Sequence, residues 1–341
     1  MYRYIMSYYN YYFVSKQSTY NYINISENTL STLDAHNSST LEIQDSYKLV
    51  FSTCNTSSDH MELSFYQMFS KTNLPIYIES KLSTIFKYND KLFKITSKKN
   101  YKTYISIIHN ILNFKLKNVV TPEEIYYNTY KKNEYIEIYP YYPDGDLYSY
   151  IENNSLNNIE KKTIFTKIVD IIYELHNINI AHRDIKPENF LIHIKNNDIS
   201  IKITDLDFCC INNTDLTFSG GTLHYASYEL LNLKKFNNWF SSDIWSLTVI
   251  LYILLFNTFP WHNSLTYNAY DKNKIYQPCD IFNNYIINEN PYKYWNLHLS
   301  KIFDKNDKYL YIYTILLNYG FNKKYNERTD ICYLQCLLTE I

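Results

Sequence analysis

Glycine is scarce in this chain of 341 residues: it occurs four times, and none lies before Gly145. A loop before that point has no bare backbone with which to approach a ligand closely. The six cysteines include no Cys-x-x-Cys motif, which argues against a paired-cysteine zinc site. We expect Cys332 and Cys336, one helical turn apart, to pack in the core of a protein from a reducing compartment.

An excess of charge of one sign is also missing, because the net charge is −1 and the pI is about 6.7. Without a basic field we expect no nucleic-acid partner and no membrane partner. The longest apolar run, Trp245–Phe256, has about 12 residues, so it predicts a buried helix rather than a membrane span. Residues Met1–Phe13 have no apolar core of the kind found in signal peptides.

Tyrosine is abundant instead, with 39 copies, and 46% of the chain is hydrophobic. A folded core is therefore expected. Tyr, Asn, Ile and Lys have A/T-rich codons, so we infer an AT-rich genome such as that of a large DNA virus or a protozoan parasite. We expect a cytoplasmic protein, found in the host cytoplasm or the virion if it is viral. The sequence carries no signal for an oligomeric state.

The chain changes character near residue 143. Before that point, short apolar runs with polar breaks predict strands within Ile76–Ile95 and at Tyr135–Tyr142, and Tyr101–Phe114 has the spacing of a helix. Residues 1–70 are rich in Ser, Thr and Asn, which predicts a polar extension that is partly disordered.

Helical spacing dominates after Gly145. Apolar residues from Ile164 to Leu175 recur on one face, as in a helix that packs on a core. Asp243 is expected to begin and cap a second strong helix. The sequence therefore predicts an α+β fold, with strands before helices.

The octapeptide His182–Asn189 carries the clearest chemistry. It follows a predicted helix and precedes the β-like run Phe190–Ile194. Asp184 can accept or orient a hydroxyl proton, Lys186 can neutralise a phosphoryl group in transfer, and Asn189 can help to hold Mg²⁺. Phosphoryl transfer needs these three functions together.

This octapeptide, His-Arg-Asp-Ile-Lys-Pro-Glu-Asn, resembles the catalytic loop of eukaryotic-type protein kinases, including the Lys typical of the Ser/Thr branch. The resemblance implies a bilobal kinase fold with a β-rich N-lobe at 74–143 and an α-helical C-lobe at 144–338. It implies ATP and Mg²⁺ as cofactors and a protein as substrate. Asp184 would be the catalytic base and Lys186 its catalytic neighbour.

A second segment, Ile201–Asp207, resembles the strand and the Asp-Phe-Gly motif of the same family. Asp205 would bind the metal and the nucleotide together with Asn189. Leu206 replaces Phe, and Asp207 replaces Gly. Asp tolerates positive φ better than most residues, and Asp207 would either add a Mg²⁺ contact or weaken nucleotide binding.

The resemblance continues through the second half of the chain. The segment Gly221–Glu229 is similar to the end of a kinase activation segment, with Tyr228 in place of the usual Pro. The helix expected at Asp243 has Thr248 where the family usually has Gly. Arg328 stands where the family has an Arg that pairs with this Glu, which predicts a Glu229–Arg328 ion pair. Arg183 would sit where the family's Arg receives a phosphate from the activation segment.

The first half matches more loosely. The segment Ile78–Lys87 stands where the Gly-rich loop would be, although it also reads as an ordinary hairpin. By resemblance Ile78 and Ile85 would contact the adenine, Ser80 and Ser83 would replace glycines, and ATP binding would be weaker or altered. Lys94 would contact the α- and β-phosphates.

The hinge resembles the family more clearly, in Tyr139–Leu147. Backbone groups there would meet the adenine edge, and Tyr139 would stand at the back of the pocket. Because Pro140 has no N–H, the donor must come from Tyr141 or Tyr142.

The family also places a Glu on the helix after the nucleotide-binding lysine. Here no acid occurs between Lys94 and Glu123, so Glu123, Glu124 or Asp207 are the candidate partners of Lys94. This gap keeps open a pseudokinase, a binding or scaffold module with a kinase fold. A small-molecule kinase is disfavoured by the activation segment. The expected function is transfer of the ATP γ-phosphate to protein Ser or Thr.

Overall fold

A computed structural model of the chain shows two compact units. The described residues before Asn100 and those from Pro122 to Tyr141 form the first unit, and those from Asn100 to Thr121 and from Tyr142 onward form the second. The predicted lobe bounds stay predictions. The structure describes residues 47–52, 76–79, 83–97, 101–128, 134–195, 198–214, 221–231, 237–260, 265–266, 277–278, 285 and 290–340.

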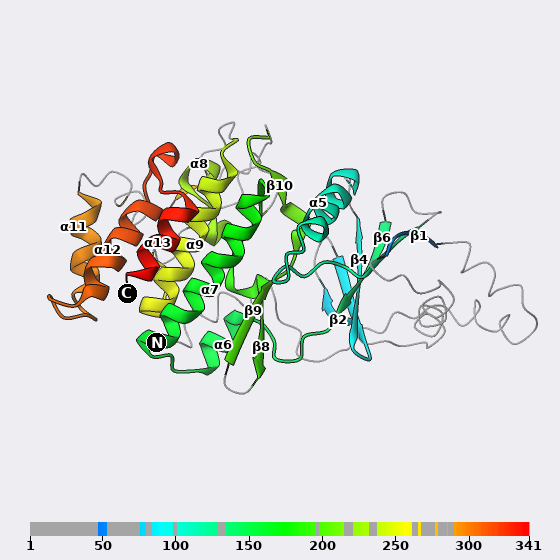
Figure 1. Cartoon of the computed structure of the whole chain (residues 1–341), viewed down its shortest axis with the longest axis horizontal. Coiled ribbons are helices and arrows are strands. Elements are labelled where there is room, and N and C mark those ends of the chain that lie inside the picture. The colour runs from blue at the N-terminus through cyan, green and yellow to red at the C-terminus, as the bar shows by residue number, and fades with distance from the viewer. Residues whose placement is uncertain are drawn as a thin grey trace, which may run out of the picture. The chain divides into compact units, whose positions relative to one another are not determined.

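The first unit is built on a six-stranded sheet in the order β1-β5-β6-β4-β3-β2, with antiparallel neighbours (Figure 1). Apolar side chains from one face form its core cluster, which includes Phe86, Phe93 and Ile138. The strands are β1 (Tyr47–Ser52), β2 (Ile76–Glu79), β3 (Ser83–Tyr88), β4 (Lys91–Ser97), β5 (Glu124–Asn128) and β6 (Glu134–Pro140).

Strands β2, β3, β4 and β6 confirm the strands predicted from the sequence. Strand β1 lies within the predicted polar extension of residues 1–70, and Tyr47–Ser52 pairs with β5 at the edge of the sheet. That this extension is partly disordered stays a prediction. The apolar run Leu49-Val50-Phe51 was the signal for it. The rest of residues 1–70 lies outside the described residues.

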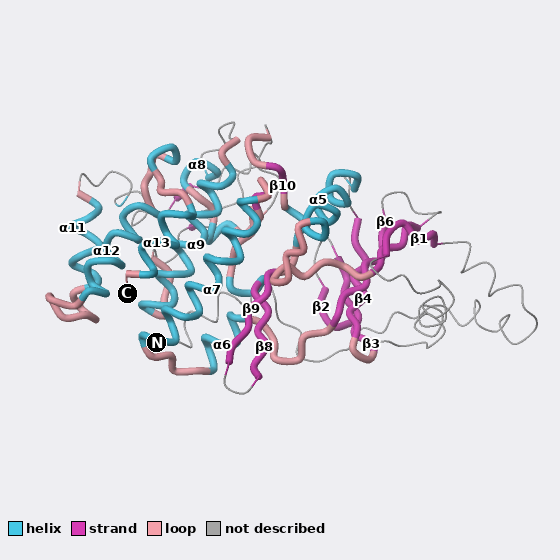
Figure 2. The backbone as a smooth tube through the Cα atoms, viewed as in Figure 1, coloured by secondary structure: helices cyan, strands magenta, loops and turns pink. Residues whose placement is uncertain are grey.

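The second unit is mainly helical (Figure 2), so the predicted change from strands to helices is confirmed. The helix predicted at Tyr101–Phe114 is present and belongs to this unit. The helices are α5 (Tyr101–Asn113), α6 (Leu147–Asn153), α7 (Asn158–Asn177), α8 (Tyr228–Leu231), α9 (Trp239–Phe256), α11 (Pro291–Leu299), α12 (Lys308–Gly320) and α13 (Ile331–Thr339).

Short strands and 3₁₀ turns complete the second unit and carry most of the loops discussed below. Strands β8 and β9 form an antiparallel hairpin. Strands β7 and β10 are far apart in the sequence and also pair antiparallel. The short strands and turns are β7 (Ile180–Ala181), β8 (Phe190–Lys195), β9 (Asp198–Ile203), β10 (Cys210–Ile211), β11 (Leu265–Thr266), β12 (Gln277–Pro278), η1 (Pro187–Asn189), η2 (Leu206–Phe208), η3 (Leu223–Tyr225) and η4 (Tyr325–Glu327).

Helix α7 begins with a capping box. The side chain of Asn157 accepts hydrogen bonds from the helix N-terminus, and the Glu160 carboxylate accepts one from the Asn157 N–H. The predicted apolar stripe from Ile164 to Leu175 is buried, which confirms the helical spacing. Helix α7 packs against α9 and α13, and its C-terminal end leads into β7.

Helix α9 corrects one prediction. It begins at Trp239, and its cap is Asn238, whose side chain accepts a hydrogen bond from the Ser241 N–H. Asp243 therefore lies inside the helix rather than at its start. The helix has 18 residues and by length and composition could cross a membrane, but 83% of it is buried inside the protein. Such burial indicates the core helix of a folded unit.

Helix α13 overturns the prediction for the cysteine pair, because Cys332 and Cys336 are both exposed. The helix buries Ile331, Leu334 and Leu338 instead. Residues at spacings of three and four share a face, and the three aliphatic residues occupy the inner one. Apolar side chains of larger area outcompete thiols for that face.

Candidate active site

The loop that carries Asp184 is held by one buried carboxylate. Asp243 on α9 accepts the backbone N–H groups of His182 at 2.8 Å and Arg183 at 2.9 Å. The same carboxylate lies 3.0 Å from Nε2 of His176 on α7. Asp243 thus anchors the loop. The sequence analysis, which expected Asp243 to cap a helix, did not predict this role.

Asp184 is the centre of a compact hydrogen-bonded cluster. Its Oδ2 accepts a bond from Nζ of Lys186 at 2.7 Å, and its Oδ1 accepts one from Oγ1 of Thr222 at 2.8 Å. Lys186 also donates to Oγ1 of Thr222 at 2.8 Å. The structure therefore brings together the two residues predicted as catalytic and adds Thr222, whose part the sequence analysis missed.

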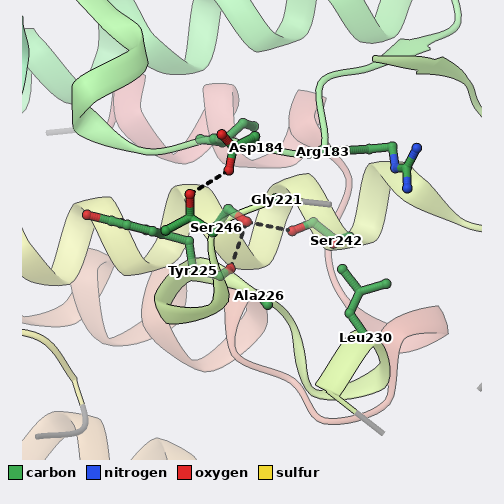
Figure 3. A pocket seen from close by; sticks show the side chains of 10 residues that line it. Arg183, Asp184, Gly221, Tyr225, Ala226, Leu230, Ser242 and Ser246 are labelled. Atoms are coloured by element: carbon green, nitrogen blue, oxygen red, sulfur yellow. Dashed lines mark hydrogen bonds between the residues drawn. The ribbon is translucent and has the colours of Figure 1, made fainter. Parts of the chain in front are cut away.

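Asp184 also lines a small pocket (Figure 3). Gly221, Tyr225 and Ala226 from the predicted activation segment line the pocket too, and Ser246 on α9 contributes to its wall. Ser246 donates to the Tyr225 carbonyl at 2.9 Å, which fixes that end of the segment against α9. The activation segment is thus held beside Asp184.

The charges in the cluster support each other. Burial acts to raise the pKa of Asp184, but the Lys186 ammonium and the hydrogen bonds from Lys186 and Thr222 outweigh it and hold this pKa below its ordinary value. Burial acts to lower the pKa of Lys186, and the Asp184 carboxylate outweighs that effect, so this pKa is raised. Both side chains therefore carry their charges at neutral pH.

Asn189 is oriented so that its side-chain oxygen can serve as a metal ligand. Its Nδ2 donates to the backbone oxygen of Asp184 at 2.7 Å and to the carboxylate at 3.2 Å. With the amide nitrogen turned to Asp184, Oδ1 meets no hydrogen-bond donor among the described residues. An amide oxygen is a ligand that Mg²⁺ accepts.

Asp205 follows β9 and has the left-handed conformation, with φ 62°. The neighbouring Thr204 is held from both sides, since its N–H donates to the Asn189 carbonyl at 2.9 Å and its carbonyl lies 3.1 Å from Nε2 of His182. The positive φ considered for Asp207 is therefore found at Asp205, and Asp207 lies in the 3₁₀ turn η2.

Asp205 and Asn189 offer the oxygen donors that Mg²⁺ requires. In the part of the chain that the structure describes, no group of three His, Cys, Asp or Glu side chains is arranged around a metal position. Mg²⁺ is usually held by one or two carboxylates together with substrate phosphates rather than by a full protein cage. The donor set of this unit fits such a metal–nucleotide complex.

Arg183 lies beside the same loop. Its guanidinium stacks 4.0 Å from the ring centre of Trp239, and Nη1 donates to the Phe208 carbonyl at 3.2 Å. Of the hydroxyls in the predicted activation segment, Thr214 donates to the Ile211 carbonyl, whereas Thr217 and Ser219 lie outside the described residues.

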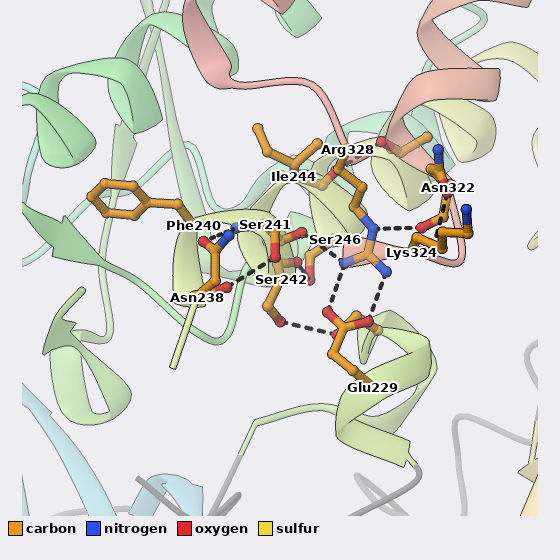
Figure 4. Close-up of polar contacts among 12 residues, drawn as sticks. Glu229, Asn238, Phe240, Ser241, Ser242, Ile244, Ser246, Asn322, Lys324 and Arg328 are labelled. Atoms are coloured by element: carbon orange, nitrogen blue, oxygen red, sulfur yellow. Dashed lines mark hydrogen bonds and ion pairs between the residues drawn. The ribbon is translucent and has the colours of Figure 1, made fainter. Parts of the chain in front are cut away.

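The predicted Glu229–Arg328 ion pair is confirmed (Figure 4). The two guanidinium nitrogens Nη1 and Nη2 bond the two carboxylate oxygens at 2.6 and 2.7 Å. Nη1 also donates to the Ser241 carbonyl on α9 at 3.0 Å. The pair therefore ties the end of the activation segment to α9 and to the segment before α13.

The first unit holds four of the predicted nucleotide-binding residues. Ile78 and Ile85 face each other across β2 and β3, and Lys94 on β4 lies opposite Ile85. Ile78 is exposed, whereas Lys94 is buried. Ser80 lies outside the described residues, so the predicted loop is seen only at its two strands.

One of the two backbone N–H groups predicted to meet the adenine already has a partner within the protein. The backbone N–H of Tyr141 donates to the Asp90 carbonyl at 2.8 Å, so it is occupied within the first unit. The Tyr141 ring lies 3.5 Å from Nζ of Lys87 and meets Tyr77 edge-on. Of the two predicted donors, Tyr142 in the second unit remains.

Two predicted partners of Lys94 are engaged elsewhere. Glu123 forms an ion pair with Lys91. Glu124 is opposite Ile138 in the sheet, on the face away from Lys94, and accepts a bond from Tyr126 at 2.6 Å. Glu124 is therefore turned away from Lys94, and Glu123 pairs with a different lysine.

Comparison with known proteins decides the family. The family model described as "Protein kinase domain" matches residues 76–312. The chain belongs to the eukaryotic protein kinase superfamily, in its Ser/Thr branch. The strand-rich and helix-rich units are then the two parts of a bilobal α+β kinase fold, and the matched range includes the Asp184 cluster.

Similarity to individual kinases is partial. The chain is 33% identical over 142 residues to "Mitosis inducer protein kinase cdr1" of Schizosaccharomyces pombe, covering 38% of this chain and 23% of that protein. It is 34% identical over 153 residues to human "MAP kinase-activated protein kinase 2", covering 43% and 38% of the two chains. The mouse protein of that name is 37% identical over 125 residues, with 35% and 32% covered. The chain thus spans less than half the length of these relatives.

Proposed function

We propose that this kinase is catalytically active and transfers the γ-phosphate of ATP to Ser or Thr hydroxyls of a protein. The observation that carries the proposal is the Asp184 cluster, in which one carboxylate bonds both Lys186 and Thr222. Its charges match the needs of phosphoryl transfer, a negative group toward the hydroxyl proton and a positive group toward the phosphate. A chain without selection for transfer has no reason to keep this arrangement.

Each residue has a distinct task in the proposed reaction. Asp184, which its lowered pKa keeps ionised, orients the substrate hydroxyl and accepts its proton. Lys186 neutralises charge on the phosphoryl group, and Thr222 fixes the geometry of both side chains. Asn189 and Asp205 would hold Mg²⁺, which supplies charge neutralisation on the phosphates when bound.

The first unit would supply the nucleotide contacts. Lys94 would bind the α- and β-phosphates, and Ile78 and Ile85 would pack on the adenine. Because the segment Ile78–Lys87 contains no glycine, we expect a KM for ATP above the usual range rather than a loss of transfer. The low glycine content tunes affinity, while the second unit performs the chemistry.

A pseudokinase is the second candidate. Three features favour it: the glycine-free segment, the absence of acids from α5, and Asp207 at the place of Gly. In this reading the fold serves as a binding or scaffold module. The retained residues Asp184, Lys186, Asn189 and Asp205 weigh against it.

Transfer of label decides between the two. We would incubate the full chain, Asp184→Asn and Asp198→Asn with Mg²⁺, labelled ATP and a basic or an acidic protein acceptor. Asp198 is an exposed carboxylate of the β8–β9 hairpin and serves as the matched control. We expect Asp184→Asn to lose about 10²–10⁴-fold in rate, with Asp198→Asn unchanged and the label on Ser or Thr. Silence of the wild-type chain beside a working reference kinase would favour the pseudokinase.

A further inference from the structure

Lys94 is a buried cation in a chain that lacks the usual helix glutamate. Only 8% of the residue is exposed, and an ammonium removed from water needs an opposite charge or several acceptors close by. The helix that carries this glutamate in related kinases corresponds to α5, which contains no Asp or Glu. A carboxylate from another element, or several acceptors, must therefore balance Lys94.

The sheet register places one carboxylate directly opposite Lys94. In the antiparallel pair β4–β6, the Cα partner of Lys94 is Glu137, and both belong to the first unit. Directly opposite residues point to the same face of a sheet, with Cβ atoms about 4.5–5.5 Å apart. Glu137 is completely buried, with an exposed fraction of 0%.

The other acids of this sheet are directed elsewhere. Side chains alternate between the two faces of each strand, and Glu124 and Glu134 lie opposite Ile138 and Ser97, on the face that Lys94 does not share. Glu123 pairs with Lys91. Among the described side chains of the strands, Glu137 is the carboxylate on the Lys94 face.

Glu137 is also held in place by its own strand. Oη of Tyr139, two residues on, donates to Oε2 of Glu137 at 2.9 Å, and Tyr139 is buried. A hydrogen bond to the charged form stabilises a buried carboxylate. The second carboxylate oxygen can then face the ammonium across the strands.

We propose that Glu137 is the positioning residue for Lys94, the carboxylate that keeps its ammonium charged and directed toward the phosphates of ATP. This rests on the proposed function for the role of Lys94 itself. Since both residues sit on neighbouring strands of one sheet, the pair forms whenever the sheet is folded. In related kinases the pair depends on the position of a helix, whereas here a helix movement would neither make nor break it.

The test compares Glu137→Gln with Glu124→Gln in the full chain. The two glutamates are closely matched: each is buried in this sheet and accepts a bond from a Tyr two residues on, but they lie on opposite faces. The readout is the pH dependence of Lys94 acetylation by trace acetic anhydride, measured by mass spectrometry of the Lys94 peptide. Because only the neutral amine reacts, the midpoint reports the pKa of Lys94 without any phosphate transfer.

A neighbouring opposite charge raises the pKa of a lysine, so removing that charge lowers the pKa. We expect Glu137→Gln to lower the Lys94 midpoint by about one pH unit or more, which makes acetylation at pH 8 about tenfold faster. Glu124→Gln should follow the wild-type curve. An unchanged midpoint in Glu137→Gln, or the same shift in both variants, would overturn the proposal.

A second measurement covers the case in which Glu137→Gln does not fold. Removing one partner of a buried pair leaves an uncompensated charge, whereas removing both does not. We expect Lys94→Met to lower the urea midpoint of unfolding, Lys94→Met/Glu137→Gln to recover it, and Lys94→Met/Glu124→Gln not to recover it. Recovery in neither double variant, or in both, would count against the pair.

Phosphate transfer in the same preparations separates this proposal from the proposed function. In an active enzyme Glu137→Gln should raise the KM for ATP about tenfold or more, leave the KM for the protein acceptor unchanged, and differ from Glu124→Gln. A midpoint shift without transfer by the wild-type chain would support the pair and overturn the function. Transfer by the wild-type chain without a midpoint shift in Glu137→Gln would support the proposed function and overturn the pair.

Discussion

Gly320 on α12 lies so close to Thr248 on α9 that a β-carbon on the glycine would come within 1.9 Å of Oγ1 of the threonine. The hydroxyl donates to the Ile244 carbonyl at 2.7 Å, which holds it toward this contact. Thr248 stands where kinases usually have Gly. In this chain the threonine side chain lies on α9 and the glycine on α12. The missing side chain of Gly320 leaves room for Thr248, so the two helices can still pack closely.

This contact predicts a dependence between the two positions. Gly320→Ala should destabilise the fold by about 1–3 kcal/mol, since overpacking forces side chains or backbone to shift. Thr248→Gly in the same chain should recover part of that loss because it clears the space. Urea unfolding of both single variants and the double variant gives the interaction free energy, and strict additivity would contradict the contact.

The Glu229–Arg328 pair predicts a large stability effect. Both side chains are almost completely buried, so Arg328→Met leaves a buried carboxylate without its cation and should cost about 3–5 kcal/mol. Glu229→Met added to Arg328→Met should recover most of it.

The exposed pair Lys324–Glu327 in the same part of the chain offers a control. Lys324→Met should leave the urea midpoint close to the wild-type value, because exposed ion pairs contribute little. If Arg328→Met behaved like Lys324→Met, the buried pair would not stabilise the fold.

The catalytic loop could be predicted because one short sequence pattern contains its residues, and the Glu229–Arg328 pair because the resemblance to protein kinases implied it. In His182–Asn189 the spacing of Asp, Lys and Asn sets their relative positions within one loop. Helical and strand periodicity likewise gave β3, β4, α5 and α7, since burial of one face dominates these elements. The exposed Cys332 and Cys336 show the limit of that reasoning, because two faces of α13 compete and aliphatic side chains win the inner one.

Apart from the Glu229–Arg328 pair, which the family resemblance supplied, contacts between distant segments could not be predicted. Thr222 bonds Asp184 across 38 positions and Asp243 bonds His182 across 61; a hydroxyl or a carboxylate in sequence does not reveal such a partner. The same holds for Glu137, whose relation to Lys94 depends on the register of β4 and β6. One residue of slippage would move it to the other face.

Replacing Thr222 should lower the rate of phosphorylation with little loss of stability. Its Oγ1 bonds both Asp184 and Lys186, so Thr222→Val removes the contact that sets their geometry. A misplacement of about 1 Å at a reacting group costs on the order of 10²-fold. We expect kcat for protein phosphorylation to fall by about that factor in Thr222→Val, while Thr222→Ser retains most of the activity. Equal loss in both variants would contradict this role, because Thr222→Ser keeps the hydroxyl that bonds Asp184 and Lys186.

The raised pKa of Glu188 predicts that the stability of the fold depends on pH. Burial raises the pKa of Glu188 to about 7, and the nearby Asp146 and Asp184 carboxylates act in the same direction, while a backbone hydrogen bond and the Lys186 ammonium oppose them. Its buried Oε2 meets no hydrogen-bond donor among the described residues. The ionised form is therefore poorly solvated in the folded state, and the folded protein holds this proton more tightly than the unfolded chain does.

The sign of the effect follows from proton binding. Between about pH 4.5 and about 7 the folded state binds more protons at Glu188 than the unfolded state, so the free energy of unfolding falls as pH rises through this window. The loss is on the order of 3 kcal/mol. Glu188→Gln keeps the neutral amide at every pH and should flatten this part of the curve, whereas the exposed control Glu152→Gln should not. Urea unfolding at pH 5, 6, 7 and 8 measures it, and parallel curves for wild type and Glu188→Gln would contradict the raised pKa.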